Sequence, residues 1–439
     1  MSRKEYFSSL YTSLMATAGL AIGIGNVWRF PYMMGSYGGS AFLVLFICCI
    51  VFISLPALMA EWALARQTRK GTIGVFMATF GPFYGRLVGY SLLFCLTIAG
   101  SYYLVVIGNV FYSGYFSTIH GFSAETTPAF QAGMENPTLQ LLIAVVILVA
   151  SIFIVHRGVK RGIEFLSNLF VPFFFLVSFY LVIRVLNLPG ASSHLSVFLE
   201  VDFRKIGFTE IFAAIGQAYF SIGLGATLTL IYGSYLKDEI RLPKLAIMTC
   251  VTDTGAALLA ALYLIPALLV FGMDLTSGPT LLFETLPKLF EIIPGGRLFG
   301  SLMLVSLVFV TFLSYVAVIE SVIGGILDDS EKVSFTKSQL LFTMFIIQVI
   351  LLVPFTFYPQ LVGIADLIFG SAGLMIGGCL ALLSLTWIVK KEKTIQQIFG
   401  GGESTLYTIY FVWIKWVVPA ILILVLGGTL YEVIGQFTN

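Results

Sequence analysis

Long runs of apolar residues, separated by short polar, glycine-rich and proline-rich breaks, extend over almost the whole chain. A helix needs about 20 residues to cross about 30 Å of hydrocarbon, and helices of about 17 residues can also span it. Every run reaches the longer of these lengths except the fourth, which has 18 residues. The pattern therefore predicts eleven membrane-spanning helices. They cover residues 10–34, 40–65, 87–116, 138–155, 163–190, 209–235, 242–273, 298–327, 338–358, 361–389 and 405–433.

The composition agrees with a membrane protein. Hydrophobic residues make up 58% of the 439 residues and charged residues 10%, whereas soluble domains have roughly 45–50% and about 25%. The net charge of +2 offers no basic surface for a nucleic acid. The five cysteines lie inside apolar runs, without the spacing of a disulfide framework or a metal site. We therefore expect an all-α polytopic protein with the lipid bilayer, and no nucleic acid, as a partner.

Positive charge is distributed unequally between the two sides of the predicted bundle. When successive loops are assigned alternately to the two sides, 17 of the 24 Lys and Arg residues fall on the side of the N-terminus. Loops rich in these residues stay in the cytoplasm. The sequence thus predicts a multi-pass protein of the cell (plasma) membrane with a cytoplasmic N-terminus and, after eleven spans, an extracellular C-terminus. The long first span favours no cleaved signal peptide.

Two short segments in the first and sixth spans are alike. One reads Ala21-Ile22-Gly23-Ile24-Gly25 and the other Ser221-Ile222-Gly223-Leu224-Gly225. An offset of five spans inverts a repeat in the membrane, which is the construction of secondary transporters with two broken helices at a central site. Glycine-rich segments also serve the close packing of helices. The match alone leaves both interpretations open.

Five ionisable residues lie at membrane depth, namely Arg29, Glu61, Asp253, Glu320 and Asp366. Such groups are costly in lipid and mark either a pathway or a pair. For Glu61 and Glu320 we favour capping of backbone groups on neighbouring helices. For Asp253 and Asp366 we favour a functional role, because their sequence neighbours are small or apolar and include no basic partner.

The first span continues as Gly25-Asn26-Val27-Trp28-Arg29-Phe30-Pro31-Tyr32, and the sixth contains Gln217-Ala218-Tyr219-Phe220-Ser221. On these residues the chain resembles the neurotransmitter:sodium symporter family. The resemblance implies the LeuT fold, a 5+5 inverted repeat with broken first and sixth helices plus an eleventh helix. The first repeat would cover residues 1–190, the second 191–390 and the eleventh span 391–439. Eleven spans, where the family commonly has twelve, are typical of a shorter bacterial-type amino-acid transporter.

The resemblance also implies the residues of the site. In the substrate pocket, the Tyr103 hydroxyl would donate to the substrate carboxylate and Phe220 would close over the substrate. The implied pocket consists of Leu20, Ala21, Gly23, Ile24, Gly25, Ala99, Tyr103, Phe220, Ser221, Gly223, Ala226, Ser314 and Val318.

Two sodium sites and two gates follow from the same resemblance. The first ion would lie among the Ala21 carbonyl, Asn26, Ser221, Asp253 and the substrate carboxylate. The second would lie among the carbonyls of Gly19, Ile22, Val310 and Leu313 and the hydroxyl of Ser314. Arg29 and Asp366 would form the outer gate, and Lys4 or Arg3 with Asp328 the inner gate.

The chain departs from the family pattern at several of these positions. Leu313 replaces a residue that usually adds a side-chain oxygen at the second sodium site, so either one or two Na⁺ ions are expected. Phe46 and Ala257 stand where chloride-dependent relatives have a Tyr and a Ser. We therefore expect no chloride. Asp253 can supply the negative charge beside sodium instead.

Gly23 bears on the substrate class. Monoamine carriers of this family have an Asp there to pair the amine, so a glycine favours a substrate that brings its own carboxylate. A roomy apolar pocket further favours a neutral, hydrophobic L-amino acid.

We expect a sodium-coupled symporter that imports this amino acid by alternating access. An enzyme is not expected, because the three histidines fall in loops and no nucleophile and base pair up at membrane depth. A non-transporting receptor or channel of the same fold is the alternative. The sequence leaves the oligomeric state open.

Overall fold

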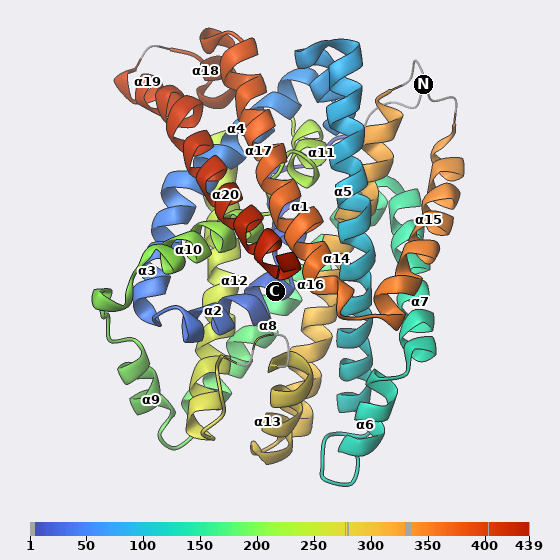
Figure 1. The fold of residues 1–439 in the computed structure, drawn as a ribbon, viewed down its shortest axis with the longest axis vertical. Helices are drawn as coiled ribbons and strands as arrows, with labels where there is room; N and C mark the ends of the chain where they lie inside the picture. Colours follow the sequence, from blue (N-terminus) through green and yellow to red (C-terminus); the bar gives the residue numbers. More distant parts are fainter. Residues whose placement is uncertain (1–4, 277, 279–280, 330–334, 403, 439) are drawn as a thin grey trace.

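The structure, a computed structural model, describes residues 5–276, 278, 281–329, 335–402 and 404–438, without the side chains of residue 205 and of residues beyond 430. In these ranges the chain is a bundle of helices with no strand (Figure 1). Its helices, with π and 3-10 segments marked η, are α1 (Leu10–Ala21), η1 (Gly25–Arg29), α2 (Phe30–Ser36), α3 (Ser40–Cys49), η2 (Ile50–Ser54), α4 (Leu55–Thr68), α5 (Thr72–Ile119), α6 (Thr127–Met134), α7 (Pro137–His156), η3 (Val159–Glu164), α8 (Phe165–Leu186), α9 (Ala191–Phe198), η4 (Phe203–Lys205), α10 (Phe208–Ser221), α11 (Leu228–Ser234), α12 (Leu242–Val270), η5 (Leu281–Thr285), α13 (Leu286–Ile292), α14 (Gly296–Leu327), α15 (Lys337–Phe357), α16 (Leu361–Ala365), η6 (Asp366–Ala372), α17 (Gly373–Leu383), η7 (Ser384–Ile388), α18 (Lys391–Phe399), α19 (Thr405–Val412), η8 (Trp413–Val417) and α20 (Val418–Thr438).

The predicted spans all correspond to helices of the described chain. Among the described residues, nine continuous segments are long and apolar enough to cross a membrane, and α1 with η1 and α2 forms a tenth that is bent by 62°. The sixth predicted span is divided into α10 and α11 by the non-helical residues 222–227. The division into repeats at residues 190 and 390 stays a prediction. The short helices α6, α9 and α13 lie in loops that the hydropathy pattern left without structure.

Local chemistry accounts for the break between α10 and α11. Gly223 and Gly225 have φ values of +70° and +130°, which glycine adopts without steric cost. Ala226, with φ +58°, is strained there. The buried Glu61 of α4 holds this backbone, because its carboxylate accepts the N–H groups of Gly225 and Ala226, each at 3.1 Å. The capping role predicted for Glu61 is confirmed.

The capping role predicted for Glu320 is wrong. Its carboxylate accepts the Tyr235 hydroxyl and forms an ion pair with Lys337 at 3.3 Å. Both partners are side chains from neighbouring segments, Tyr235 directly after α11 and Lys337 at the start of α15, so Glu320 is engaged by side chains and caps no described backbone group. A lysine at the start of α15 neutralises the charge instead.

The end of the bundle nearest the N-terminus is closed by aromatic packing. Phe7 is fully buried and lies 5.8 Å, ring centre to ring centre, from both Tyr232 and Tyr235. Its N–H donates to the Tyr235 carbonyl at 3.1 Å, and the next residue, Ser8, bonds the carboxylate of Glu164 at the start of α8. The segment before α1 is therefore fastened to both α11 and α8.

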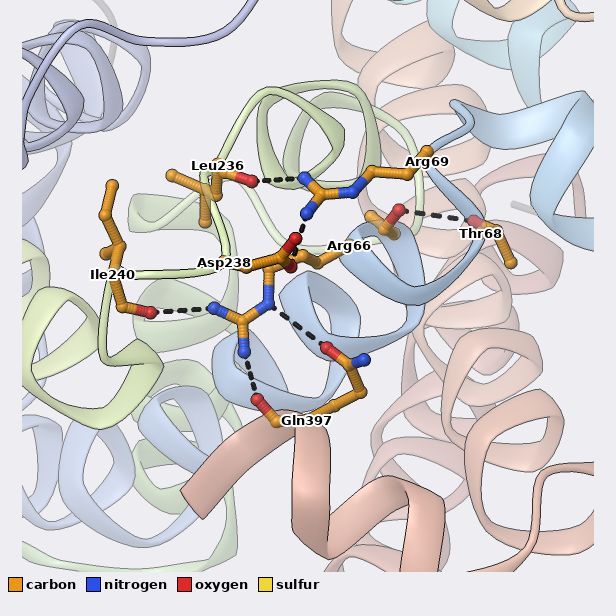
Figure 2. Close-up of polar contacts among 8 residues, drawn as sticks. Arg66, Thr68, Arg69, Leu236, Asp238, Ile240 and Gln397 are labelled. Atoms are coloured by element: carbon orange, nitrogen blue, oxygen red, sulfur yellow. Dashed lines mark hydrogen bonds and ion pairs between the residues drawn. The ribbon is translucent and has the colours of Figure 1, made fainter. Parts of the chain in front are cut away.

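Two arginines connect the loops at the same end (Figure 2). Arg66, buried near the end of α4, donates to the Ile240 carbonyl at 2.7 Å and to the backbone and side chain of Gln397 in α18. Arg69 donates to the Leu236 carbonyl and pairs with Asp238. These contacts join α4, the loop before α12 and the amphipathic α18 into one unit.

Candidate functional site

A cavity of about 550 Å³ opens between the two broken helices and reaches α5, α14, η6 and α17. Twelve of the thirteen predicted substrate residues line it, namely Leu20, Ala21, Gly23, Ile24, Gly25, Ala99, Tyr103, Phe220, Ser221, Gly223, Ser314 and Val318. The exception is Ala226, which does not line the cavity. Its N–H donates to the Glu61 carboxylate, and its carbonyl accepts the Thr72 hydroxyl. These bonds fix the backbone of Ala226 within the second break, away from the cavity.

Three of the residues predicted for the first sodium ion meet in the protein interior. Asn26 donates from Nδ2 to a carboxylate oxygen of Asp253 at 2.7 Å, and the Ser221 hydroxyl donates to the other at 2.7 Å. Asn26 and Asp253 are fully buried. A buried carboxylate without a cation is costly, and no ion pair reaches Asp253 from the described residues. A carboxylate, an amide and a hydroxyl in contact provide the oxygens that a hard cation prefers.

The amide of Asn26 also shapes the break in the first span. Its Oδ1 accepts the Gly23 N–H at 3.0 Å. A cation that took this oxygen would compete with that hydrogen bond. Ion binding and the backbone conformation at Gly23, which faces the cavity, are therefore physically linked.

A second group of oxygens surrounds Ser314 of α14. Its hydroxyl lies 3.3 Å from the Gly19 carbonyl, 3.1 Å from that of Ile22 and 3.3 Å from that of Val310. One hydroxyl hydrogen cannot satisfy three carbonyls, so acceptors outnumber donors, as a cation site requires. The side chain of Leu313 packs against Gly19 and contributes carbon only.

The backbone of the first break faces two hydroxyls. A Cβ placed on Gly23 would lie 2.9 Å from the Tyr103 hydroxyl oxygen and 3.3 Å from that of Ser314, and one on Gly25 would lie 3.1 Å from the Phe220 ring. An aspartate at position 23 would therefore have to displace Tyr103.

The two residues predicted for the outer gate line the same cavity without pairing. The guanidinium of Arg29 stacks over the Phe220 ring at 4.8 Å, and Asp366 accepts the Tyr102 hydroxyl at 2.9 Å. Between Arg29 and Asp366, both of them described, there is no ion pair. Their pairing stays a prediction for a closed pathway.

We expect Asp366→Asn to lower the uptake rate about tenfold while changing equilibrium binding less than threefold. A tenfold change corresponds to about 1.4 kcal/mol, an ordinary value for a partly buried charged pair that forms only in the closed state. Initial uptake rates and equilibrium binding measure the two effects separately, with Asp202→Asn in the exposed 199–207 loop as control. Undiminished uptake would argue against the pair.

The predicted inner gate is described only in part. Lys4 and Arg3 lie outside the described residues. Asp328, at the end of α14, accepts the N–H of Gly71, which precedes α5. The aspartate is thus placed at the closed end of the bundle.

At the positions where chloride-dependent relatives bind chloride, the side chains of this protein either contain only carbon or already donate a hydrogen bond to another protein group. Phe46 and Ala257 are fully buried and carry no polar side-chain atom. The Nε2 of Gln217 donates to the Gly25 carbonyl at 3.1 Å, and the Ser221 hydroxyl donates to Asp253.

The cavity also has walls that the sequence analysis did not predict. They include Leu92, Cys95 and Leu96 of α5, Thr227 beside the second break, and Phe369 and Leu374. For Thr227 a signal existed, because it lies two residues after the repeated glycine segment. The others are apolar residues in apolar spans, and hydropathy alone cannot tell which of these face a cavity.

Comparison with known proteins places this geometry in context. The profile of the sodium:neurotransmitter symporter family matches residues 4–129 and 115–436. The sodium-dependent transporter YhdH of Bacillus subtilis is 29% identical over 94% of this chain and 94% of its own. The sodium- and chloride-dependent GABA transporter 2 of Bos taurus is 25% identical over 77% of this chain and 64% of its own. Among solved structures, MhsT in complex with L-phenylalanine has a TM-score of 0.87 at 26% identity, covering 96% of this chain and 99% of that one.

Proposed function

The chain belongs to the sodium:neurotransmitter symporter family, and we propose that it couples the import of a neutral, largely apolar L-amino acid to sodium. The observation that carries this proposal is the arrangement around Gly23. The Tyr103 and Ser314 hydroxyls face it from one side, and Asn26, which bonds its N–H, contacts Asp253. An α-carboxylate bound there would meet hydroxyl donors and a sodium ion together.

This arrangement explains the coupling in physical terms. A substrate carboxylate that completes the sodium shell raises the affinity for the ion, and by linkage the ion raises the affinity for the substrate by the same factor. A single buried Asp253 balances one positive charge, and the substrate carboxylate adds the second negative charge. The oxygen shell of the sodium ion is therefore complete only when the substrate carboxylate is bound.

The walls of the cavity favour an apolar side chain. Leu20, Ala99, Val318 and Leu228 present carbon to the cavity, while the charged residues of its lining, Arg29 and Asp366, are the predicted outer gate. A charged side chain deep in this pocket would lose its hydration without finding a partner. The L-phenylalanine bound to the structurally similar MhsT is consistent with this choice.

The ions and the orientation complete the proposal. Asp253 provides the negative charge that chloride provides in chloride-dependent relatives, so transport proceeds without chloride. In the second cluster three carbonyls surround the Ser314 hydroxyl, and Leu313 adds no side-chain oxygen, so one Na⁺ binds firmly and a second more weakly. The end closed by Phe7 faces the cytoplasm, the C-terminus lies outside, and the substrate enters from the opposite side.

Reconstituted proteoliposomes test the proposal. An inward sodium gradient is expected to drive accumulation of labelled Leu, Phe or Trp, and unlabelled Lys or Glu is expected to compete at least tenfold less well. Potassium in place of sodium serves as control. Competition by Lys or Glu as strong as by Leu would refute the apolar substrate class. Sodium-dependent binding without accumulation would indicate a receptor instead.

A further inference from the structure

Thr227 is the last residue of the second break, residues 222–227, and the only one of them with a polar side chain, and it lines the cavity. We infer that its hydroxyl selects substrates whose mainly apolar side chain carries an N–H or O–H donor. The inference rests on the proposed function, and it adds a specificity-determining residue and a narrower substrate class.

The hydroxyl of Thr227 has no partner in the described part of the chain. Thr227 is 3% exposed, and its Oγ1 is enclosed without a hydrogen bond. An enclosed hydroxyl left unpaired is unfavourable. A threonine at this position, just before α11, usually caps the helix with its side chain, yet no such bond forms here. The Thr227 hydroxyl therefore stabilises neither the break nor the start of α11 in this structure.

The hydroxyls of other threonines near the second break have hydrogen-bond partners. The Thr229 hydroxyl donates to Glu61, and the Thr72 hydroxyl donates to the Ala226 carbonyl at 3.0 Å. Both of these residues stabilise the break, and neither lines the cavity. Thr227, by contrast, lines the cavity and has an unpaired hydroxyl.

Most other polar groups of the cavity are already assigned. Tyr103, Ser221 and Ser314 lie at the carboxylate and sodium positions, and Tyr102, Arg29 and Asp366 at the outer gate. Asn109, two turns beyond Tyr102 on α5, also lines the cavity with an unpaired Oδ1. Thr227 and Asn109 are thus left to interact with the substrate side chain, and of the two only Thr227 belongs to the second break.

Apolar walls approach the break closely on the Thr227 side. A Cβ on Gly225 would lie 2.8 Å from the Leu374 Cα, and one on Gly373 would lie 3.4 Å from the Cys95 Cβ. The backbone of the break, α17 and α5 are thus in van der Waals contact around a mainly carbon lining. In such surroundings one hydroxyl discriminates effectively, because a substrate without a donor leaves it unpaired.

The chemistry of threonine suits this role. Its hydroxyl both donates and accepts, and one rotamer step exchanges hydroxyl and methyl without moving the backbone. A neutral hydrogen bond that replaces an unpaired group changes affinity by about 3-fold to 10-fold.

Matched substrate pairs test the inference. Each pair differs by one donor: Tyr and Phe, Thr and Val, and Trp and 3-benzothienylalanine, in which sulfur replaces the indole N–H. Inhibition constants against labelled Leu in saturating sodium are expected to favour the donor-bearing member of at least one pair 3-fold to 10-fold. Thr227→Val is expected to reduce that ratio to below twofold, and Thr227→Ser to preserve it.

Thr254→Val is the matched control. Its hydroxyl is also unpaired, but Thr254 does not line the cavity, so the ratios are expected to stay as in the wild type. Sodium-dependent Leu binding verifies that each variant is folded. Equal affinities within every pair, or a preference that persists in Thr227→Val, would overturn the role of Thr227 while leaving amino-acid transport intact. Failure of all amino acids to bind would overturn the proposed function itself, and this inference with it.

Discussion

Asp253→Asn is expected to raise the sodium concentration for half-maximal transport at least tenfold. The carboxylate is fully buried and accepts hydrogen bonds from Asn26 and Ser221, and the described residues offer it no ion pair. Asparagine keeps the volume but removes the full negative charge beside the ion. In a low-dielectric site, losing one charge a few ångströms away costs more than the roughly 1.4 kcal/mol that corresponds to tenfold.

Sodium titrations of initial uptake, performed in chloride and in gluconate, measure this effect. Wild-type rates are expected to be equal in the two media. The variant is expected to be impaired in both, because Phe46 and Ala257 leave no site where chloride replaces the lost charge. Asp202→Asn, in an exposed loop, is the control. An unchanged half-saturation in Asp253→Asn would remove this residue from the sodium site, and a wild type that requires chloride would refute chloride independence.

The spans and their breaks could be predicted from the sequence because lipid imposes simple demands. About 20 apolar residues are needed to cross it, and a helix interrupted within it needs residues that tolerate unusual backbone angles. In the second repeated segment Gly223 and Gly225 meet that need with positive φ values, whereas Gly23 and Gly25 of the first segment have no positive φ. The motif around Asn26 then indicated the family, and twelve of the thirteen substrate residues that the resemblance implied line the cavity.

The errors concern features that depend on where a side chain or peptide points. Ala226 lies between cavity-lining residues in sequence, but its peptide is turned toward Glu61 and Thr72. Glu320 forms an ion pair with Lys337, which lies on the next helix. The sequence does not show how the loop between α14 and α15 brings the two residues together. The Thr229 hydroxyl donates to Glu61, whereas Thr227 lines the cavity with an unpaired hydroxyl, and hydropathy does not encode that difference.

The outer gate shows a further limit. Arg29 and Asp366 have opposite charges and line one cavity, yet here they contact Phe220 and Tyr102 instead of each other. Their pairing in a more closed pathway stays a prediction. A sequence specifies all the states of a transporter at once, so it predicts the partners but not the state in which they meet.

Glu61→Gln is expected to have the second large effect, on both stability and substrate affinity. Glu61 is buried, and its two oxygens accept the N–H groups of Gly225 and Ala226 together with the Thr229 hydroxyl. Glutamine has one acceptor oxygen and presents an NH₂ group where the carboxylate accepted. At least one buried donor then loses its partner, at about 1–3 kcal/mol. The strained φ of Ala226 would no longer be held.

Because the same break carries Ser221 and Gly223 into the cavity, its loosening also weakens binding. We expect a lower unfolding temperature in detergent and an amino-acid affinity reduced at least tenfold in saturating sodium. Glu210→Gln is the matched control. Glu210 accepts the Gly207 N–H at 2.8 Å at the more exposed end of the same α10, where water can replace the lost acceptor, so both quantities should stay near wild-type values. If Glu61→Gln binds substrate as tightly as the control, the carboxylate does not hold the break in its binding conformation.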